Sequence, residues 1–177
     1  MANPKRLQPP LTEKIAQELR AGDEVLISGV VYTARDVAHK RLCELIEAGR
    51  QLPFPLEGAI IYFVGPTPAR PGKVIGAAGP TTSSRMDSFS PILIANGLKA
   101  MIGKGYRGSI VRDALKKYTA VHFSTIGGAG AILSKHIVAA QVIAYKDLGT
   151  EAIQKLEVID FPAVVAYDAH GRSIYSS

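Results

Sequence analysis

Residues 76–104, GAAGPTTSSRMDSFSPILIANGLKAMIGK, combine a glycine- and proline-rich turn, four hydroxyl side chains at 81–84, and the cations Arg85, after the hydroxyls, and Lys104, at the end. Glycine lets the backbone approach a ligand closely, and consecutive amides with hydroxyls make good cradles for anions. Arg85 can hold a carboxylate through two parallel hydrogen bonds, and Lys104 can add a point charge. Serine and threonine clusters also simply cap helices. The stretch indicates a site for a small acid if a second segment has the same character.

Such a segment follows the first long strand. Residues 23–32, DEVLISGVVY, are rich in β-branched residues and predict a strand, with Gly29 at a bulge. A helix follows, with Val37, Leu42, Leu45 and Ile46 on one stripe, capped by Thr33 or Asp36 and ended by Gly49. Arg35 therefore lies at a strand-to-helix junction, where free amides and the helix dipole favour anions. Arg35 and His39 share a face of this helix. A solvated first turn is the simpler alternative.

The remaining pattern alternates strands with helices, which predicts an α/β domain with a mixed central sheet and flanking helices. Residues 1–10 are expected to form an irregular N-terminal arm, and 11–177 a single domain. Residues 65–80 form a long glycine- and proline-rich loop, which we expect to be functional. Residues 148–158 fit either a helix or a strand. Helices are expected near 11–19 (capped by Thr12), 88–95 (capped by Asp87 or Ser88), 108–117 and 126–133, and strands at 58–64, 74–75, 100–102, 120–124, 138–145 and 163–167.

Composition narrows the function classes. The net charge of +6 is dispersed along the chain without an aromatic-basic signature, which argues against nucleic acid. No run of about 18 apolar residues predicts a membrane span, and the N-terminus does not resemble a signal peptide, so we expect a cytoplasmic protein. The single cysteine, Cys43, is expected to be a small buried hydrophobe. The four histidines form no metal-ligand pattern, so we expect no metal site on this chain.

Five segments together resemble one family. They are YTARDVAHKRL (32–42), GPTTSSRMD (79–87), GKGYRG (103–108), FSTIGGAGA (123–131) and DLGTEAIQKLEVIDFPA (147–163). Each is similar to the matching stretch of the β subunit, or C-terminal domain, of the class I fumarase and L-tartrate dehydratase family of iron–sulfur hydro-lyases. The segments occur in the family's order from about residue 10 onward, and several long motifs in order are far more specific than one short pattern.

The resemblance implies a single swivelling-type β/β/α domain and reversible trans addition of water to fumarate, giving (S)-malate. It also implies a [4Fe-4S] cluster held by the cysteines of a partner α subunit. A higher heteromer such as α2β2 would be compatible with it. On this interpretation the chain is a β subunit that is active only with its α subunit.

The family's functional residues fall on matching positions of this sequence. Arg35 and Arg85 would bind the two carboxylates of a small dicarboxylate substrate, and Lys104 would complete the pocket. Thr81 would be the candidate catalytic base. A threonine hydroxyl is a poor base near neutral pH, so we expect a carboxylate of the partner subunit to activate it. Asp36 and His39 would not contact the substrate themselves but would orient Arg35.

Two alternatives remain open at this stage. The chain could be the β subunit of an L-tartrate dehydratase, converting tartrate to oxaloacetate. Relatives commonly carry a glycine-containing TAGR or AAGR where this chain has Thr82-Ser83-Ser84-Arg85, and the extra hydroxyls bear on substrate preference. A different class of function, a non-catalytic anion-binding or assembly module, would use the same four side chains without a partner. Fold analogy alone does not choose among them.

Overall fold

The computed structural model describes residues 3–125 and 129–175, and within them seven strands form one mixed sheet in the order β1-β2-β3-β4-β5-β7-β6. The first five are parallel, whereas β7 runs antiparallel to β2, β5 and β6. The predicted α/β class and mixed sheet are confirmed. The strands are β1 (Lys5–Leu7), β2 (Glu24–Thr33), β3 (Ile60–Tyr62), β4 (Ala100–Gly103), β5 (Val121–Ser124), β6 (Ile137–Ala144) and β7 (Ile153–Tyr167).

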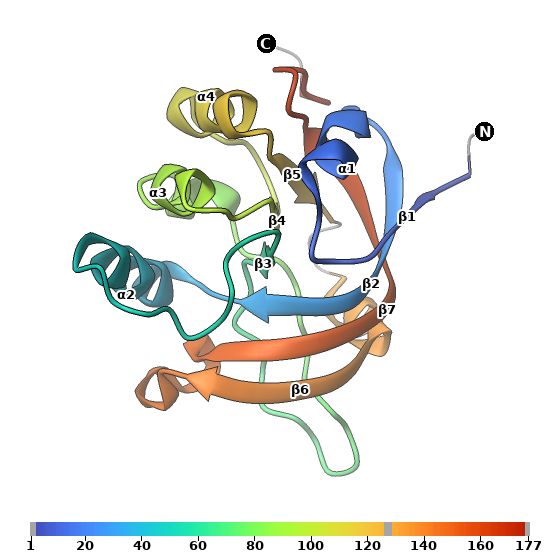
Figure 1. Cartoon of the computed structure of the whole chain (residues 1–177). Coiled ribbons are helices and arrows are strands. Elements are labelled where there is room, and N and C mark those ends of the chain that lie inside the picture. The colour runs from blue at the N-terminus through green and yellow to red at the C-terminus, as the bar shows by residue number, and fades with distance from the viewer. Residues whose placement is uncertain (1–2, 126–128, 176–177) are drawn as a thin grey trace.

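Three helices, α2, α3 and α4, lie side by side against one face of the sheet (Figure 1). Helix α1 lies apart from them, on the other side of the molecule (Figure 1). Short 3₁₀ turns fill several connections. The helices are α1 (Glu13–Glu18), α2 (Asp36–Glu47), α3 (Ser90–Ala95), α4 (Ser109–Tyr118) and α5 (Gly130–Leu133), and the 3₁₀ turns are η1 (Ser83–Met86), η2 (Ser134–His136) and η3 (Lys146–Glu151). None of the helices among the described residues is long and apolar enough to cross a membrane.

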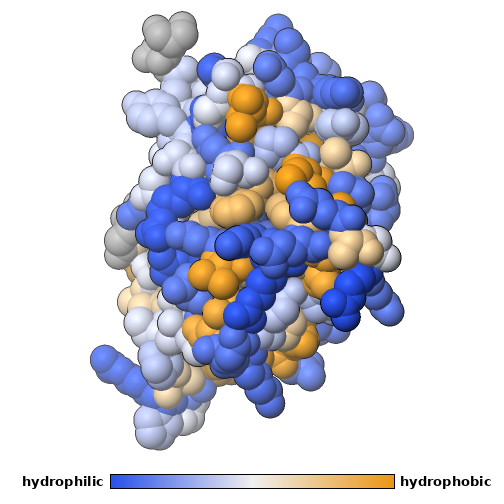
Figure 2. Space-filling model, turned by 90° about the vertical axis from the view of Figure 1, so that its left-hand side faces the viewer, coloured by the Kyte–Doolittle hydropathy of each residue, from blue (hydrophilic) through white to orange (hydrophobic). Residues whose placement is uncertain are grey.

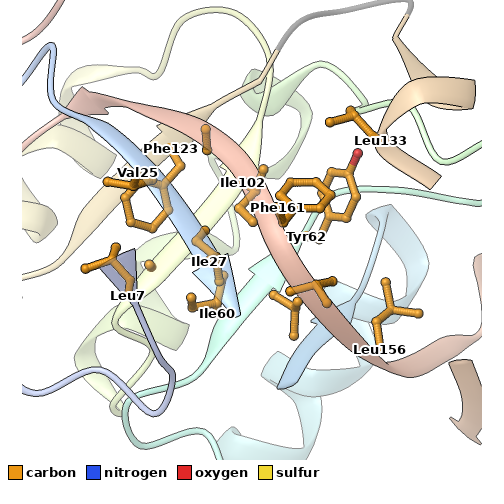
Figure 3. Close-up of a cluster of buried hydrophobic side chains, with 14 of the residues drawn as sticks. Leu7, Val25, Ile27, Ile60, Tyr62, Ile102, Phe123, Leu133, Leu156 and Phe161 are labelled. Atoms are coloured by element: carbon orange, nitrogen blue, oxygen red, sulfur yellow. The ribbon is translucent and has the colours of Figure 1, made fainter. Parts of the chain in front are cut away.

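The pairing of β2 with β7 joins β2, β3, β4, β5 and β7 into a closed circuit of strands. Its interior is one of two hydrophobic cores, to which Tyr62, Phe123 and Phe161 contribute buried rings (Figure 3). The second core lies between the outside of the strands and helices α2 to α4. On β3, Ile60 faces the first core and Ile61 the second, so this strand is covered on both faces, as its apolar run predicts.

The helices α2 and α4 are amphipathic, which explains why they cover only one side of the sheet. Their inward stripes include Leu42 and Leu115, which are fully buried. Hydrophilic side chains cover most of the face that the helices turn outward, with separate apolar patches between them (Figure 2). Burying each large aliphatic side chain stabilises the fold by about 1.5–3 kcal/mol.

Several expected local features are confirmed. Thr12 caps α1 by accepting a hydrogen bond from the backbone amide of Ile15. The register of β2 shifts at Gly29, whose φ of 132° is unfavourable for other residues. Asn96 and Gly97 end α3, and Cys43 is buried. The turn expected at 126–130 lies partly outside the described residues.

Other local expectations are wrong. Residues 5–7 of the N-terminal arm are not irregular but form β1, because the edge of β2 offers backbone groups for parallel pairing. Residues 74–75 are not a strand. The segment that holds them extends away from the sheet (Figure 1). The ambiguous residues 148–158 divide into η3 and the first part of β7.

None of the four side chains proposed to cap α2 and α3, namely Thr33, Asp36, Asp87 and Ser88, caps its helix. Thr33 instead donates to the carbonyl of Ala152 and accepts from the amide of Gln154, which ties β2 to the start of β7. Asp87 is engaged by Arg107 and by the amide of Gly108. In both cases a tertiary partner competes successfully for a side chain that could have capped locally.

Candidate active site

The carboxyl ends of β2, β3 and β4 meet at one edge of the sheet, because these strands are parallel and in register at Thr33, Tyr62 and Ile102. Ligands of α/β proteins commonly bind at such an edge. Arg35 lies just beyond β2, and Lys104 just beyond β4. The two cations, which are far apart in the sequence, thus follow strands that end at the same edge of the sheet, with β3 between them.

Thr81 is attached to this edge by its backbone. Its amide donates to the carbonyl of Phe63, immediately after β3, at 2.8 Å, and its carbonyl accepts from the amide of Lys104 at 3.2 Å. The amide of Ser83 then donates to the carbonyl of Lys104 at 2.8 Å. The hydroxyl-rich segment therefore extends the sheet beyond β4 and places Thr81 beside Lys104. The side chain of Thr81 is partly exposed, and that of Lys104 is exposed.

Arg85 reaches the same place from η1. Its Nη2 donates to Oδ2 of Asp36, in the first turn of α2, at 2.5 Å, and its side chain remains 51% exposed. About half of the Arg85 side-chain surface is thus accessible from outside. Asp36 was expected to orient Arg35, but its carboxylate pairs with Arg85. The reason is that η1, which carries Arg85, packs against α2.

Arg35 is held by different groups. Its Nε lies 3.6 Å from Oε1 of Glu151, and its side chain packs against Gly65, where an added Cβ would be 3.2 Å from the Arg35 Cδ. Glycine at position 65 therefore leaves room for the guanidinium. Glu151 could not be predicted as a partner of Arg35, because η3 is more than a hundred residues away along the chain and no local pattern links the two.

His39 is completely buried one turn into α2. Its Nδ1 lies 2.8 Å from the carbonyl of Arg35, so it contacts the residue that it was expected to orient. Its ring lies edge-on to Phe63 at 5.2 Å and near Phe89 at 6.2 Å. Burial, with a smaller contribution from the Arg107 charge, lowers the pKa of His39 to about 4, so the ring is neutral at pH 7.

Buried polar atoms that have no hydrogen-bond partner gather at this site, although one of them, Nε of Arg35, lies within ion-pair distance of Glu151. Within residues 3–125 and 129–175, the atoms of this kind on side chains are Nε of Arg35, Oδ1 of Asp36 and Nε2 of His39. All three belong to the turn that opens α2. Buried polar groups are normally satisfied, so such a concentration is typical of a functional site rather than of a folding core.

The described side chains can also be tested for their ability to bind a metal ion. No group of three or more histidine, cysteine, aspartate or glutamate side chains among the described residues could hold a metal ion. Burial raises the pKa of the Cys43 thiol to about 11, so this thiol is protonated at neutral pH and unsuited to ligate iron. The described side chains thus do not fit an iron–sulfur cluster.

Three further cavities lie away from the Thr81–Lys104 pair. One of about 520 Å³ separates the 67–77 segment from α5 and η2, and another of about 590 Å³ lies between β2, β7 and α5. A smaller one of about 220 Å³ lies between Pro66 and Thr150, the latter beside Gly65. None of them is lined by the two arginines, Thr81 or Lys104.

Comparison with known proteins supplies the family. The profile described as Fumarase C-terminus matches residues 3–177, nearly the whole chain. The chain belongs to the fumarase C-terminus family. The resemblance carried by the five sequence segments is thereby confirmed.

Curated relatives of this fumarase C-terminus chain include the anaerobic class I fumarate hydratase of Escherichia coli, 36% identical over 173 residues, which are 96% of this chain and 32% of that protein. Fumarate hydratase 2 of Leishmania major is 37% identical over 93% of this chain and 30% of its own length. A provisionally named L(+)-tartrate dehydratase subunit beta of Methanocaldococcus jannaschii is 36% identical over 93% of this chain and 88% of its own length. The chain therefore spans about a third of the fumarate hydratases but most of the tartrate dehydratase subunit.

Proposed function

We propose that this chain is the β subunit of a two-subunit class I fumarate hydratase, which interconverts fumarate and (S)-malate. The observation that carries the proposal is the meeting of two guanidinium groups with the Thr81–Lys104 pair at one edge of the sheet. A four-carbon dicarboxylate has a negative charge at each end, so it calls for two cationic groups a molecule's length apart. The relatives of the same family support the assignment.

Each of the four residues has a distinct role in this proposal. Arg35 and Arg85 bind the two carboxylates, and their planar forks fix the orientation of the substrate. Thr81 carries the proton that is removed from the carbon next to a carboxylate during dehydration and returned during hydration. Lys104 stabilises the negative charge that builds up on that carboxylate when the proton leaves. Asp36 and His39 hold Arg85 and the first turn of α2 in place.

Two functional groups of the proposed enzyme, the cluster and the carboxylate that activates Thr81, would come from a partner subunit. We propose that a partner α subunit holds the [4Fe-4S] cluster, which supplies a Lewis acid for the substrate's hydroxyl and carboxylate when bound. The same subunit would provide a carboxylate that accepts a proton from the Thr81 hydroxyl. The fumarate hydratases among the relatives are about three times as long as this chain, which leaves room for such a component. We also assign the domain to the swivelling β/β/α type and the enzyme to the cytoplasm.

L-tartrate dehydratase is the second candidate function. It is favoured by one observation, the match of this chain to most of the length of a tartrate dehydratase β subunit. The same side chains would serve both reactions, because tartrate is also a four-carbon diacid that loses water. The chemistry at Thr81 is unchanged, and the difference lies in how the site accommodates a second hydroxyl group.

The test is anaerobic co-expression with a cluster-bearing α subunit, followed by assays of fumarate hydration and L-tartrate dehydration. Hydration of fumarate is the expected result. Dehydration of tartrate in its place would retain the roles of the residues and replace the substrate. A lack of activity on both, in a preparation whose cluster is spectroscopically intact, would overturn the proposal and favour an anion-binding module.

A further inference from the structure

A chain of buried polar side chains joins Arg107 to the segment that carries Arg85. The guanidinium of Arg107, 4% exposed as a residue, donates from Nε to Oδ1 of Asp87 at 2.8 Å and from Nη2 to Oγ of Ser90 at 2.6 Å. Its third bond, from Nη1, reaches Nδ1 of His122 at 3.2 Å. On the other side of the ring, Nε2 of His122 lies 3.1 Å from Oγ of Ser83.

The chemistry of arginine fixes the direction of these hydrogen bonds. A guanidinium has no acceptor, so Nδ1 of His122 must accept from Arg107 and cannot carry a proton. The ring is therefore neutral, its proton is on Nε2, and it donates to Ser83. Complete burial and the Arg107 charge agree with this assignment, because both hold the pKa of His122 well below its usual range. Ser83 is consequently held by a donor of defined tautomer.

The position of Ser83 is constrained on its other sides as well. Its amide donates to the carbonyl of Lys104 at 2.8 Å. Its Oγ lies directly over Gly103, where an added Cβ would be only 2.2 Å away and would also lie 2.8 Å from the Phe63 ring. Since Ser83 begins η1, these contacts set the direction in which the turn leaves the sheet edge and reaches Arg85.

We propose that Arg107 and His122 are positioning residues that, through Ser83, fix the separation between Arg85 and the Thr81–Lys104 pair and thereby set the length of the dicarboxylate that the enzyme accepts. This inference rests on the proposed function. Thr81 and Lys104 are joined directly by their backbones, whereas Arg85 is connected to them through the η1 turn. The spacing between the two ends of the substrate site therefore depends on how firmly the start of that turn is held.

A purely structural role would use the same bonds, so the test needs a measurement that loss of stability does not change. The variant is Ser83→Ala, which removes the acceptor but keeps the backbone contacts of the turn. The assembled enzyme is assayed for kcat and KM, and for inhibition by malonate, succinate and glutarate, which have three, four and five carbons. The matched control is Ser28→Ala on β2, away from the candidate site. It also removes a serine hydroxyl that accepts a hydrogen bond, in this case from the backbone amide of Asp160 at 3.0 Å.

We expect Ser83→Ala to lower kcat/KM at least tenfold and to reduce the preference for succinate over malonate and glutarate at least fivefold. Ser28→Ala should leave that preference unchanged. An active Ser83→Ala enzyme with the unmodified preference would overturn this inference alone. An inactive unmodified assembly would overturn the proposed function and the inference together.

The hydrogen-bond geometry can be checked without enzymatic activity. In the ¹⁵N-labelled full-length chain, the ring nitrogen shifts of His122 should show protonation at Nε2 and an unprotonated Nδ1 at pH 7. Loss of the Ser83 hydroxyl should change the Nε2 signal more than the Nδ1 signal. A ring protonated on Nδ1, or on both nitrogens, would contradict the direction of the chain of bonds and overturn the inference.

Discussion

His39 should make the stability of this protein fall steeply in weak acid. Its pKa is about 4 in the folded state, against an ordinary value of 6.5. Between these values the unfolded chain binds a proton that the native state excludes, so stability decreases as the pH falls. Each pH unit in this window is worth about 1.36 kcal/mol, so the loss from His39 at pH 5 is about 2 kcal/mol. His122, whose folded pKa is also lowered, acts in the same direction.

The informative variant is His39→Phe. A phenyl ring suits the surroundings, because the imidazole lies near the Phe63 and Phe89 rings and its Nε2 has no hydrogen-bond partner. The carbonyl of Arg35 keeps the hydrogen bond from the backbone amide of residue 39. The lost side-chain bond, worth about 1 kcal/mol, is offset by removing an unsatisfied buried nitrogen. We expect near-wild-type stability at pH 7 and about 2 kcal/mol less loss between pH 7 and pH 5.

Urea unfolding at pH 7, 6 and 5 measures the effect directly. With a slope of about 1–3 kcal/mol per molar urea, the two proteins should differ by about 1 M in how far their midpoints move. His170→Gln, which replaces an exposed histidine, shows whether any histidine substitution alters the dependence. Equal losses for the wild type and His39→Phe would refute the assignment of His39 as a buried neutral group.

Three further predictions concern the site. Thr81→Ala should abolish turnover of the assembled enzyme but leave assembly intact by gel filtration, and residual activity within about tenfold of wild type would show that Thr81 is not the base. Arg85→Lys should raise KM by about tenfold or more with a smaller change in kcat, because the ammonium cannot form a bidentate pair, and steady-state kinetics would show this. Gly103→Ala should destabilise the fold by about 1–3 kcal/mol in urea titrations, since its Cβ would meet the Ser83 hydroxyl and the Phe63 ring; an unchanged midpoint would mean that the turn can shift freely.

Local sequence signals predicted most elements and the residues of the site edge. The continuous apolar run at 58–64 gave a correct strand because β3 is buried on both faces. The β-branched run at 23–32 gave a correct strand because β-branched residues favour extended backbone, although β2 is only partly buried. Arg35, Thr81 and Lys104 were grouped from sequence by the anion-binding character of their segments and by the family resemblance, and in the structure Arg35 and Lys104 each follow a parallel strand, β2 and β4. Their roles as base and carboxylate ligands stay predictions.

Contacts between distant segments could not be predicted in the same way. The Arg35–Glu151 pair and the Arg107–His122–Ser83 chain join side chains from different elements, and no periodicity encodes such meetings. A lone polar residue inside the apolar strand at 121–123 was the available signal for His122. The predicted helix caps were wrong because a local signal was present but a tertiary contact prevailed. Asp87 and Thr33 could have bonded to nearby backbone amides, but they bond to Arg107 and Gln154 instead.

The strand β7 has a consequence for how the chain acquires its structure. It pairs with β2, β5 and β6, and the register that joins Glu24 to Val164 connects opposite ends of the sequence. Such non-local pairing must close a very long loop before it gains any stability, which makes folding slow. During synthesis β2 lacks this neighbour until nearly the whole chain has left the ribosome. A nascent chain that stops short of residue 153 would therefore present an unpaired, apolar strand edge, the kind of surface that chaperones recognise and that drives aggregation.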